Sequence, residues 1–311
     1  MSTNFPNGLE SAGVPLMGSG SEIPSTTGSY FFVDSATGND SNTGKVKDSA
    51  MATLDAAVNL CTANKGDVII VMPNHTENLA TAGVLTLDVA GITIVGLGTG
   101  GQKPNLVHTA DTADIDITGA DTTIRNIRIT SNTADCTASL DVEALDVWLD
   151  GVDWREGSNL CFVDVIVTAG DNTCDGLKIT NCSCLGTDEA NDGFVNATGG
   201  DIDRFTLQNN HLVLKVATTE PVIKVTGKSL TNALVTNNYV DRQNLSGFSF
   251  VDSDQSDNSG IFAYNCIASA DVAAATPFDV TGAACFENYQ MGDPAADASG
   301  LLLPAVDNNT T

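Results

Sequence analysis

The sequence predicts an all-β fold, a parallel β-helix of about eight coils, on three observations. Eight short segments share one pattern and end in asparagine or glycine, at intervals between 23 and 30 residues. A near-constant period of this length is typical of stacked repeats. Apolar residues alternate with others around the shared position, as they do in strands with one buried face. The units are also rich in Thr, Val, Ile and Asn, a composition that favours strands over helices.

The shared position is predicted to be a sharp bend between two strands. Asparagine and glycine most readily accept the left-handed backbone conformation that such a bend requires. Asparagines in register along the axis also predict a ladder, in which each side-chain amide bonds to the coil above or below. The predicted bend ladder comprises Gly96, Asn126, Gly151, Asn181, Asn209, Asn237, Asn265 and Asn288.

Two registers beside the bend predict columns of buried side chains. The first lies two residues before each bend, at Ile94, Ile124, Leu149, Ile179, Leu207, Val235, Ala263 and Phe286. The second lies three residues after each bend, at Thr99, Ile129, Trp154, Cys184, Leu212, Val240, Ala268 and Met291. Repetition of these registers stacks similar side chains along the axis of a solenoid.

The chain of 311 residues has 39 acidic and 13 basic residues, which gives a formal charge of −26. This balance argues against a nucleic-acid partner, because such binding needs Lys and Arg to displace counterions from phosphates. No apolar run approaches the ~20 residues that span a bilayer, and the first residues lack a basic stretch followed by an apolar core. We therefore expect no nucleic-acid partner, no membrane partner and no secretory signal.

The eight cysteines are expected to be reduced, since disulfides are rare in chains that are not exported. Cys182 and Cys266 each follow a predicted bend by one residue, and Cys184 falls in a predicted inward column. The favoured interpretation is that they are small buried apolar side chains. Cys182-Ser-Cys184 lacks the spacing of a zinc site or a redox pair.

The chain divides into four predicted regions. Residues 1–28 are rich in Gly, Ser and Pro and cannot bury themselves, which predicts an extended arm that anchors the protein in an assembly. Residues 29–77 form the first strand, a capping helix and the first coil, residues 78–291 the β-helix, and residues 292–311 a closing segment. The candidate anchor residues of the arm are Phe5, Pro6, Val14, Pro15, Leu16, Met17, Ile23 and Pro24.

The cap of the solenoid is predicted from residues 29–77, because exposed strand edges at the end of a solenoid must be covered. A strand over Tyr30–Val33 precedes a short amphipathic helix, and Lys65-Gly66 is a favourable stop for this helix. Asp67–Met72 is predicted to be a strand buried on both sides. The buried helical face is Leu54, Ala57, Val58 and Cys61. At the other end, Leu301–Leu303 is either a closing strand or an adhesive patch.

Residues 31–77 resemble the start of many pectin-lyase-like right-handed β-helix proteins, through FVDSATGNDSNTG, ATLDAAVNLCTANKGDVIIV and MPNHTE. The arm NFPNGLESAGVPLMG, this cap and the short coils together make nearly the whole chain similar to β-helix proteins of tailed bacteriophages. The coil motifs are common to the superfamily and say little about function, whereas the arm and the cap are more particular.

The resemblance implies that the parallel β-helix is right-handed and that the chain is a non-enzymatic virion structural protein. The favoured form is a homotrimeric decoration (cement) protein that binds the major capsid protein or another virion protein. It is expected on the capsid surface, and in the host cytoplasm during assembly. The alternative is a tail fibre or tailspike that binds or cleaves host surface polysaccharide.

Polysaccharide hydrolases and lyases of the same superfamily make an enzyme the main rival. The sequence has no Asp-Asp pair, no Gly-His-Gly turn and no Arg-x-Lys. His75, His108 and His211 lie in different contexts, and His211 is expected to contact Tyr239 of the next coil. We therefore expect no catalytic residue.

Two arginines are the best candidates for a lyase base. Arg125 and Arg128 are expected to pair across coils with Asp150 and Asp153, which makes them structural, because arginine stays protonated. Trp148 is the only tryptophan expected on the outer surface.

No cofactor is expected, and the alternative is a weakly bound Ca²⁺ at two Asp-rich loops. The first loop contains Asp34, Asp40 and Asn42, and the second contains Asp252, Asp254 and Asp257. Neither loop has the distal Glu of an EF-hand, and Asp is also a common turn residue. Turn formation is therefore the simpler explanation of both.

Overall fold

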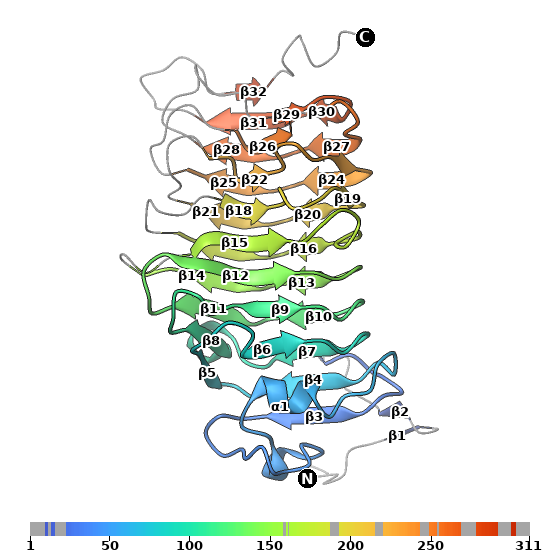
Figure 1. Cartoon of the computed structure of the whole chain (residues 1–311), viewed down its shortest axis with the longest axis vertical. Helices are drawn as coiled ribbons and strands as arrows, with labels where there is room; N and C mark the ends of the chain where they lie inside the picture. Colours follow the sequence, from blue (N-terminus) through green and yellow to red (C-terminus); the bar gives the residue numbers. More distant parts are fainter. Residues whose placement is uncertain are drawn as a thin grey trace, which may run out of the picture.

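The computed structural model describes residues 10–11, 14–15, 23–157, 160, 162–186, 193–214, 220–242, 249–253, 255–268, 278–291 and 300–302. These residues form a right-handed parallel β-helix, which confirms the predicted fold class (Figure 1). Two long sheets of ten strands and one of eight run along the axis, and consecutive coils add one strand to each.

The first sheet starts at the N-terminal end and contains β3 (Tyr30–Val33), β4 (Val68–Val71), β7 (Thr93–Gly96), β10 (Thr123–Arg125), β13 (Trp148–Asp150), β16 (Lys178–Thr180), β20 (Thr206–Gln208), β24 (Ala233–Thr236), β27 (Gly260–Ala263) and β30 (Ala284–Phe286). The second sheet contains β5 (Thr76–Leu79), β8 (Asn105–His108), β11 (Arg128–Ser131), β14 (Asp153–Arg155), β17 (Ser183–Leu185), β21 (His211–Val213), β25 (Tyr239–Asp241), β28 (Cys266–Ala268), β31 (Asn288–Met291) and β32 (Gly300–Leu302).

The third sheet contains β6 (Leu85–Leu87), β9 (Ile115–Ile117), β12 (Cys136–Val142), β15 (Phe162–Thr168), β18 (Gly193–Asn196), β22 (Ile223–Lys224), β26 (Val251–Ser253) and β29 (Phe278–Val280). The remaining elements are short: β1 (Glu10–Ser11), β2 (Val14–Pro15), β19 (Ile202–Asp203), β23 (Leu230–Thr231), η1 (Lys47–Ser49), η2 (Gly100–Gln102) and α1 (Leu54–Val58).

The core consists of stacked apolar columns, as the alternation in the sequence predicts. In the first sheet, each inward side chain is the register partner of the one in the next coil. Strands in register lie about 4.8 Å apart, so each side chain packs on its neighbour along the axis. This column is Ile69, Ile94, Ile124, Leu149, Ile179, Leu207, Val235 and Phe262, all buried.

Left-handed residues mark the bend between the first and second sheets in five consecutive coils. They are Asn126, Gly151, Asn181, Asn209 and Asn237, with φ between 54° and 65°. In the next two coils, Tyr264 (φ 60°) and Glu287 (φ 50°) take this position. The predicted register is therefore wrong for Asn265 and Asn288, which lie one residue beyond the bend.

Gly96 also departs from the predicted role, because it has no left-handed conformation and is the last residue of β7. A Cβ at this position would clash with the carbonyl oxygen of Asn126 in the next coil. Close approach of two backbones, rather than conformational freedom, thus explains this glycine.

The one-residue slip in the last two coils also moves the predicted columns. Phe262 and Ile267 point inward, whereas Phe286 and Met291 are 40% and 41% exposed. Cys266 is the register partner of Tyr239 and does not share the register of Cys182. A shift of one residue reverses the face of every side chain in a strand. In the first coil, Thr99 is exposed and Leu106 is the register partner of Ile129, so the predicted column is also wrong at Thr99.

The amide ladder lies one residue after the bend, in a buried column of Asn210, Asn238, Asn265 and Asn288. The side chain of each of the first three donates to the side-chain oxygen of the next, at 2.9 Å. The same oxygens also accept from backbone N–H groups at 3.1 Å. The ladder therefore satisfies amides that water cannot reach.

The N-terminal cap contains the predicted helix and strands, but the helix is shorter than expected. Thr53 caps α1 by accepting from Ala56 N–H at 3.3 Å, and the helix ends at Val58 rather than near Lys65-Gly66. Asp67 accepts from the N–H of Thr62 at 2.7 Å and so holds the chain in a turn after the helix.

The arm contributes β1 and β2, which pair antiparallel beside the N-terminal end (Figure 1). Val14 and Pro15 lie in β2, and Pro24 accepts a 3.0 Å hydrogen bond from the hydroxyl of Tyr30. Phe5, Pro6, Leu16 and Met17 lie outside the described residues. At the other end, β32 pairs antiparallel with β31, in agreement with the closing-strand interpretation.

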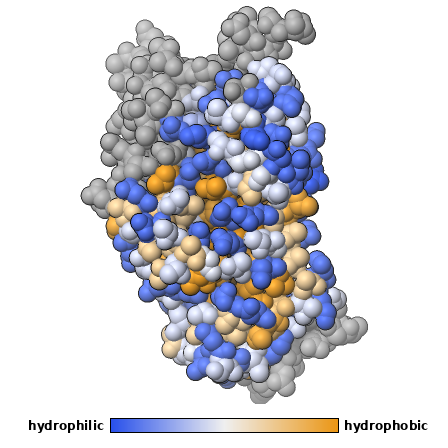
Figure 2. Space-filling view, in the orientation of Figure 1, coloured by the Kyte–Doolittle hydropathy of each residue, from blue (hydrophilic) through white to orange (hydrophobic). Residues whose placement is uncertain are grey.

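On the face that carries the third sheet, hydrophilic side chains are interspersed with separate hydrophobic patches (Figure 2). Within the described part of the chain, no helix is long and apolar enough to cross a membrane.

Candidate functional site

A groove on the outer surface follows the bend between the first and second sheets. It is lined by Val95, Arg125, Asn126, Asp150, Gly151 and Asn181. The lining residues come from four consecutive coils and are adjacent because the strands stack in register. The number of residues in each coil therefore decides which outward side chains are neighbours in this region.

The first half of the site is an ion pair in the groove. Arg125 Nε donates to one oxygen of Asp150 at 3.1 Å, and the arginine is 32% exposed. The other oxygen of Asp150 accepts from Thr180 at 3.0 Å and from Asn181 at 2.7 Å. The guanidinium of Arg125 also lies over the ring of Trp148, 4.7 Å from its centroid. The arginine is thus held by a carboxylate and an aromatic face together.

The second half lies just after the bend and is built around Asp153, whose side chain is only 5% exposed. One of its oxygens accepts from Arg128 at 3.0 Å. The other forms an ion pair with Arg155 Nε at 2.7 Å and accepts from the hydroxyl of Ser183 at 2.6 Å. Every oxygen of Asp150 and Asp153 therefore accepts a hydrogen bond from a neighbouring side chain.

A fourth cation, Lys103, completes the group. Its ammonium donates to the carbonyl of Gly151 at 3.0 Å, and burial lowers the pKa of Lys103. We call Lys103, Arg125, Arg128 and Arg155 the basic cluster. It gathers four of the 13 basic residues of the chain around two carboxylates, so its local charge is positive on a strongly acidic protein.

The predicted cross-coil pairs of Arg125 with Asp150 and of Arg128 with Asp153 are therefore present. Arginine is a poor base because it stays protonated, and both carboxylates are already bonded. The chemistry that the cluster offers is binding of an anionic group by guanidinium N–H donors.

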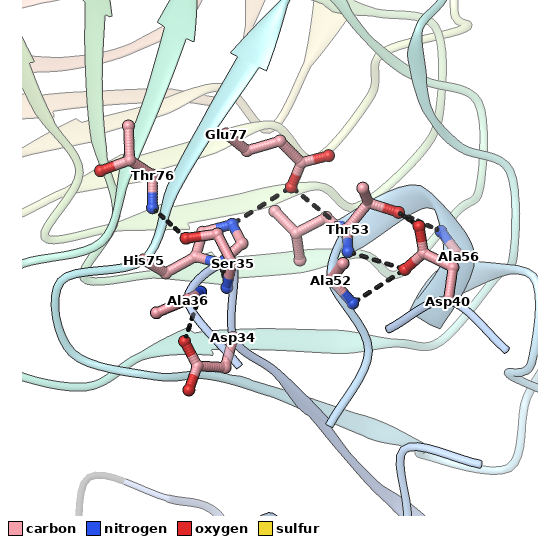
Figure 3. A network of polar contacts seen from close by, with 11 residues as sticks. Asp34, Ser35, Ala36, Asp40, Ala52, Thr53, Ala56, His75, Thr76 and Glu77 are labelled. Carbon is pink, nitrogen blue, oxygen red and sulfur yellow. Dashed lines mark hydrogen bonds and ion pairs between the residues drawn. The ribbon is translucent and has the colours of Figure 1, made fainter. Parts of the chain in front are cut away.

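The three histidines have structural environments. His75 accepts from the N–H of Ser35 through Nδ1 at 3.0 Å, so its proton lies on Nε2, which faces Glu77 at 3.2 Å (Figure 3). The Ser35 hydroxyl accepts from the N–H of Thr76 at 2.9 Å and does not face the imidazole. The same Glu77 oxygen accepts from the N–H of Leu54 at 2.9 Å, which ties the second sheet to α1.

The other two histidines pack against aromatic rings. His108 is buried and faces the carbonyl of Ser139 at 3.2 Å, and burial lowers its pKa to about 4. Its ring meets Phe162 edge-on. His211 meets Tyr239 of the next coil edge-on, with ring centroids 4.9 Å apart, as the sequence predicts.

The Asp-rich loops use their carboxylates to hold backbone turns. Asp40 accepts from the N–H groups of Ala52 and Thr53 at 2.8 and 2.9 Å (Figure 3). Asp34 accepts from Ala36 at 2.9 Å and Thr37 at 2.7 Å, and these bonds lower its pKa. Asn42 instead donates to the carbonyl of Ala50 at 2.7 Å.

In the second loop, Asp257 accepts from the hydroxyl of Ser229, and Asp252 from that of Thr226 at 3.4 Å. Asp254 lies outside the described residues. Among the residues that the structure describes, no group of three or more His, Cys, Asp or Glu is arranged to hold a metal ion.

The cysteines within the described ranges are free thiols. Cys182 and Cys184 are buried, in agreement with their interpretation as small apolar side chains. Burial raises the pKa of Cys182 to about 12, so this thiol stays protonated at neutral pH.

One charged feature was missed in the sequence. Asp116 of β9 and Asp141 of β12 are register partners on the outer face of the third sheet. Asp114 and Glu143 lie beside them, and we call these four residues the acidic column. Burial and the carboxylate of Glu143 raise the pKa of Asp141 to about 6. The spacing of Asp116 and Asp141 equals that of Arg125 and Asp150, so the coil period was the signal that locates the pair.

No protein-family model and no curated protein sequence matches this chain. Among solved structures, a rhamnogalacturonan lyase is similar at 12% identity and a TM-score of 0.40, over 90% of this chain and 66% of that one. The GH136 lacto-N-biosidase from Eubacterium ramulus, as its selenomethionine derivative, is similar at 11% identity and a TM-score of 0.40, over 84% and 67%. The activities in these names belong to those proteins, and at these scores nothing about this chain follows from them.

Proposed function

We propose that this chain is a non-enzymatic structural protein of a tailed bacteriophage particle. In this proposal it is a trimeric decoration protein that binds the major capsid protein on the outside of the head, without a cofactor. The arm of residues 1–28 joins the shell and the β-helix projects from it. The similarity of the arm and the cap to phage β-helix proteins suggests this setting.

The observation that carries the proposal is an apolar outer surface at the N-terminal end. Val68, Ile70 and Val95 point outward from β4 and β7 and are nevertheless buried. Ile23 of the arm packs against them, together with partly buried side chains of the first coils. This apolar cluster holds the arm against the body of the β-helix at Ile23, so the residues that precede Ile23 start from the N-terminal end, where we propose that they join the shell.

The basic cluster supports a binding role rather than catalysis. The two carboxylates that it surrounds, Asp150 and Asp153, accept hydrogen bonds at every oxygen, and the guanidinium of Arg125 covers one face of Trp148. A tail fibre or tailspike that recognises polysaccharide stays the alternative, and copy number separates it from a decoration protein.

The test is the number of copies of this protein per copy of the major capsid protein in purified virions. We expect a ratio near one. A ratio of a few per cent would place it in the tail or at a single vertex, and binding to host polysaccharide would then be the function to measure. Complete absence from the particle would overturn the structural role.

A shortened protein tests the arm. Removing residues 1–22 keeps Ile23 on its apolar patch, so the body should melt at the parent temperature while binding to undecorated capsids is lost. Removing residues 303–311 at the other end is the matched control and should leave capsid binding intact.

A further inference from the structure

The basic cluster has more donors than its own carboxylates use. Asp150 and Asp153 each bond an arginine through Nε, and among the described residues the terminal nitrogens of Arg125 and Arg155 have no carboxylate of their own. Arg155 is 43% exposed and Arg125 is 32% exposed. Guanidinium groups presented in this way bind carboxylates through paired N–H donors.

The acidic column lacks a cationic partner among the described residues. Asp116 and Asp141 are stacked as register partners, and no ion pair within the described residues includes either of them. Stacked strands are about 4.8 Å apart, so two carboxylates in this relation repel each other. Leu145 beside this column is 42% exposed, and Val84 is 37% exposed. The column thus combines unpaired carboxylates with exposed apolar side chains, as interfaces do.

Both features lie at the same height along the axis. In chain order, β9 precedes β10, and β12 lies between β11 and β13. Figure 1 shows β9 level with β10, and β12 level with β13. The basic cluster occupies the bend between the first and second sheets, whereas the acidic column occupies the third sheet, so a single chain cannot bring them together.

We propose that a second copy of this chain places its acidic column against the basic cluster, with the two β-helix axes parallel. Rotation about an axis parallel to the β-helix keeps every residue at its own height, so the two surfaces meet in register. The contact is heterologous, because each copy uses two different surfaces side by side. Repeated contacts of this kind close into a ring when the rotation between neighbouring copies allows it.

The large negative charge of the chain does not forbid this contact. At physiological ionic strength charges more than about 8 Å apart are largely screened, whereas pairs in contact at an interface are screened much less. Local complementarity then decides which surfaces meet. The number of copies in the ring rests on the proposed trimer. The pairing of the acidic column with the basic cluster does not depend on that number.

The test is sedimentation velocity of the full chain and of three charge variants. Arg125→Glu with Arg155→Glu reverses the basic cluster, and Asp116→Lys with Asp141→Lys reverses the acidic column. Each should raise the dissociation constant roughly 10- to 100-fold. All four substitutions in one chain recreate the complementarity with the charges exchanged and should restore association to near the parent value.

Lys47→Glu with Lys65→Glu is the control for the reversal of the basic cluster, because it makes the same charge change on exposed residues of the cap and should leave association unchanged. Circular dichroism establishes that each variant is folded. If a reversal unfolds the chain, Arg125→Gln with Arg155→Gln removes the cluster with less perturbation and should still weaken association.

Two results would overturn the inference. One is a parent chain that stays monomeric at all concentrations, and the other is a fourfold variant that associates no better than the double variants. The proposed function can fail separately, since a chain that forms rings through these surfaces but is absent from virions would refute only the phage role. A monomer present in virions at a ratio near one would refute only this contact.

Discussion

Replacing Asn238 by alanine is the sharpest test of the amide ladder. Its side-chain oxygen accepts from the backbone and side-chain amides of Asn210, at 3.1 and 2.9 Å. Its amide donates to the carbonyl of Leu207 and to the side-chain oxygen of Asn265, both at 2.9 Å. Asn238 is only 1% exposed, so water does not replace these bonds without opening the coil.

The expected loss follows from the number of bonds and the burial of the partners. Four hydrogen bonds disappear, and a typical bond contributes about 1 kcal/mol net, with a larger cost when a buried partner stays unsatisfied. We therefore expect Asn238→Ala to lower the free energy of unfolding by about 3–5 kcal/mol.

The measurement is urea unfolding followed by circular dichroism, with Asn237→Gly as the control. Asn237 is the adjacent residue, but it is exposed and left-handed, with φ 58°. Glycine accepts that conformation, so the control should change the free energy of unfolding by less than about 0.5 kcal/mol. If Asn238→Ala cost no more than this control, the ladder would contribute nothing and the reasoning would be wrong.

Three further outcomes follow from the same coils. Burial and Glu143 raise the pKa of Asp141 to about 6 in the folded state, so stability falls as the pH rises from about 4 to 6. Asp141→Asn should therefore stabilise the chain by about 1 kcal/mol at pH 7.5, after allowance for solvent screening, with little effect at pH 4 in parallel urea titrations. Asn237→Val should cost about 1–3 kcal/mol through backbone strain, and a melting temperature equal to that of the parent would contradict it. Trp154→Phe should cost about 2–4 kcal/mol in the same unfolding assay, because it opens a cavity and removes the 2.7 Å bond to the buried Ser139 hydroxyl.

The fold was predictable because the coil period and the apolar alternation appear directly in the sequence. The bend register was predictable only in part. Asn209-Asn210 and Asn237-Asn238 contain two adjacent asparagines, of which the first makes the bend and the second joins the ladder. A single asparagine, such as Asn265, fits either role. Because the coils were aligned on their asparagines, Asn265 was assigned to the bend. Tyr264 takes that conformation instead, although a left-handed tyrosine is uncommon.

The pairs of the candidate site were predictable wherever two partners are one coil apart and lie in the same strand position. Arg125 and Asp150 satisfy that condition, and so do Asp116 and Asp141. The positive charge of the basic cluster was not predictable from spacing, because Lys103 reaches Gly151 from a loop outside the strands. Loop side chains follow no coil period, so their contacts need the three-dimensional structure.

Opposite charges and like charges are stacked by the same geometry in this chain. The interval of 25 residues that pairs Arg125 with Asp150 also places Asp141 on Asp116. An outward position of a strand accepts almost any polar residue, so nothing in the fold requires two carboxylates there. Their repulsion lowers the stability of the isolated chain, and a cation supplied from outside would remove that cost. In the proposed contact, the basic cluster of a second copy would supply that cation, because it lies at the same height along the axis as the acidic column.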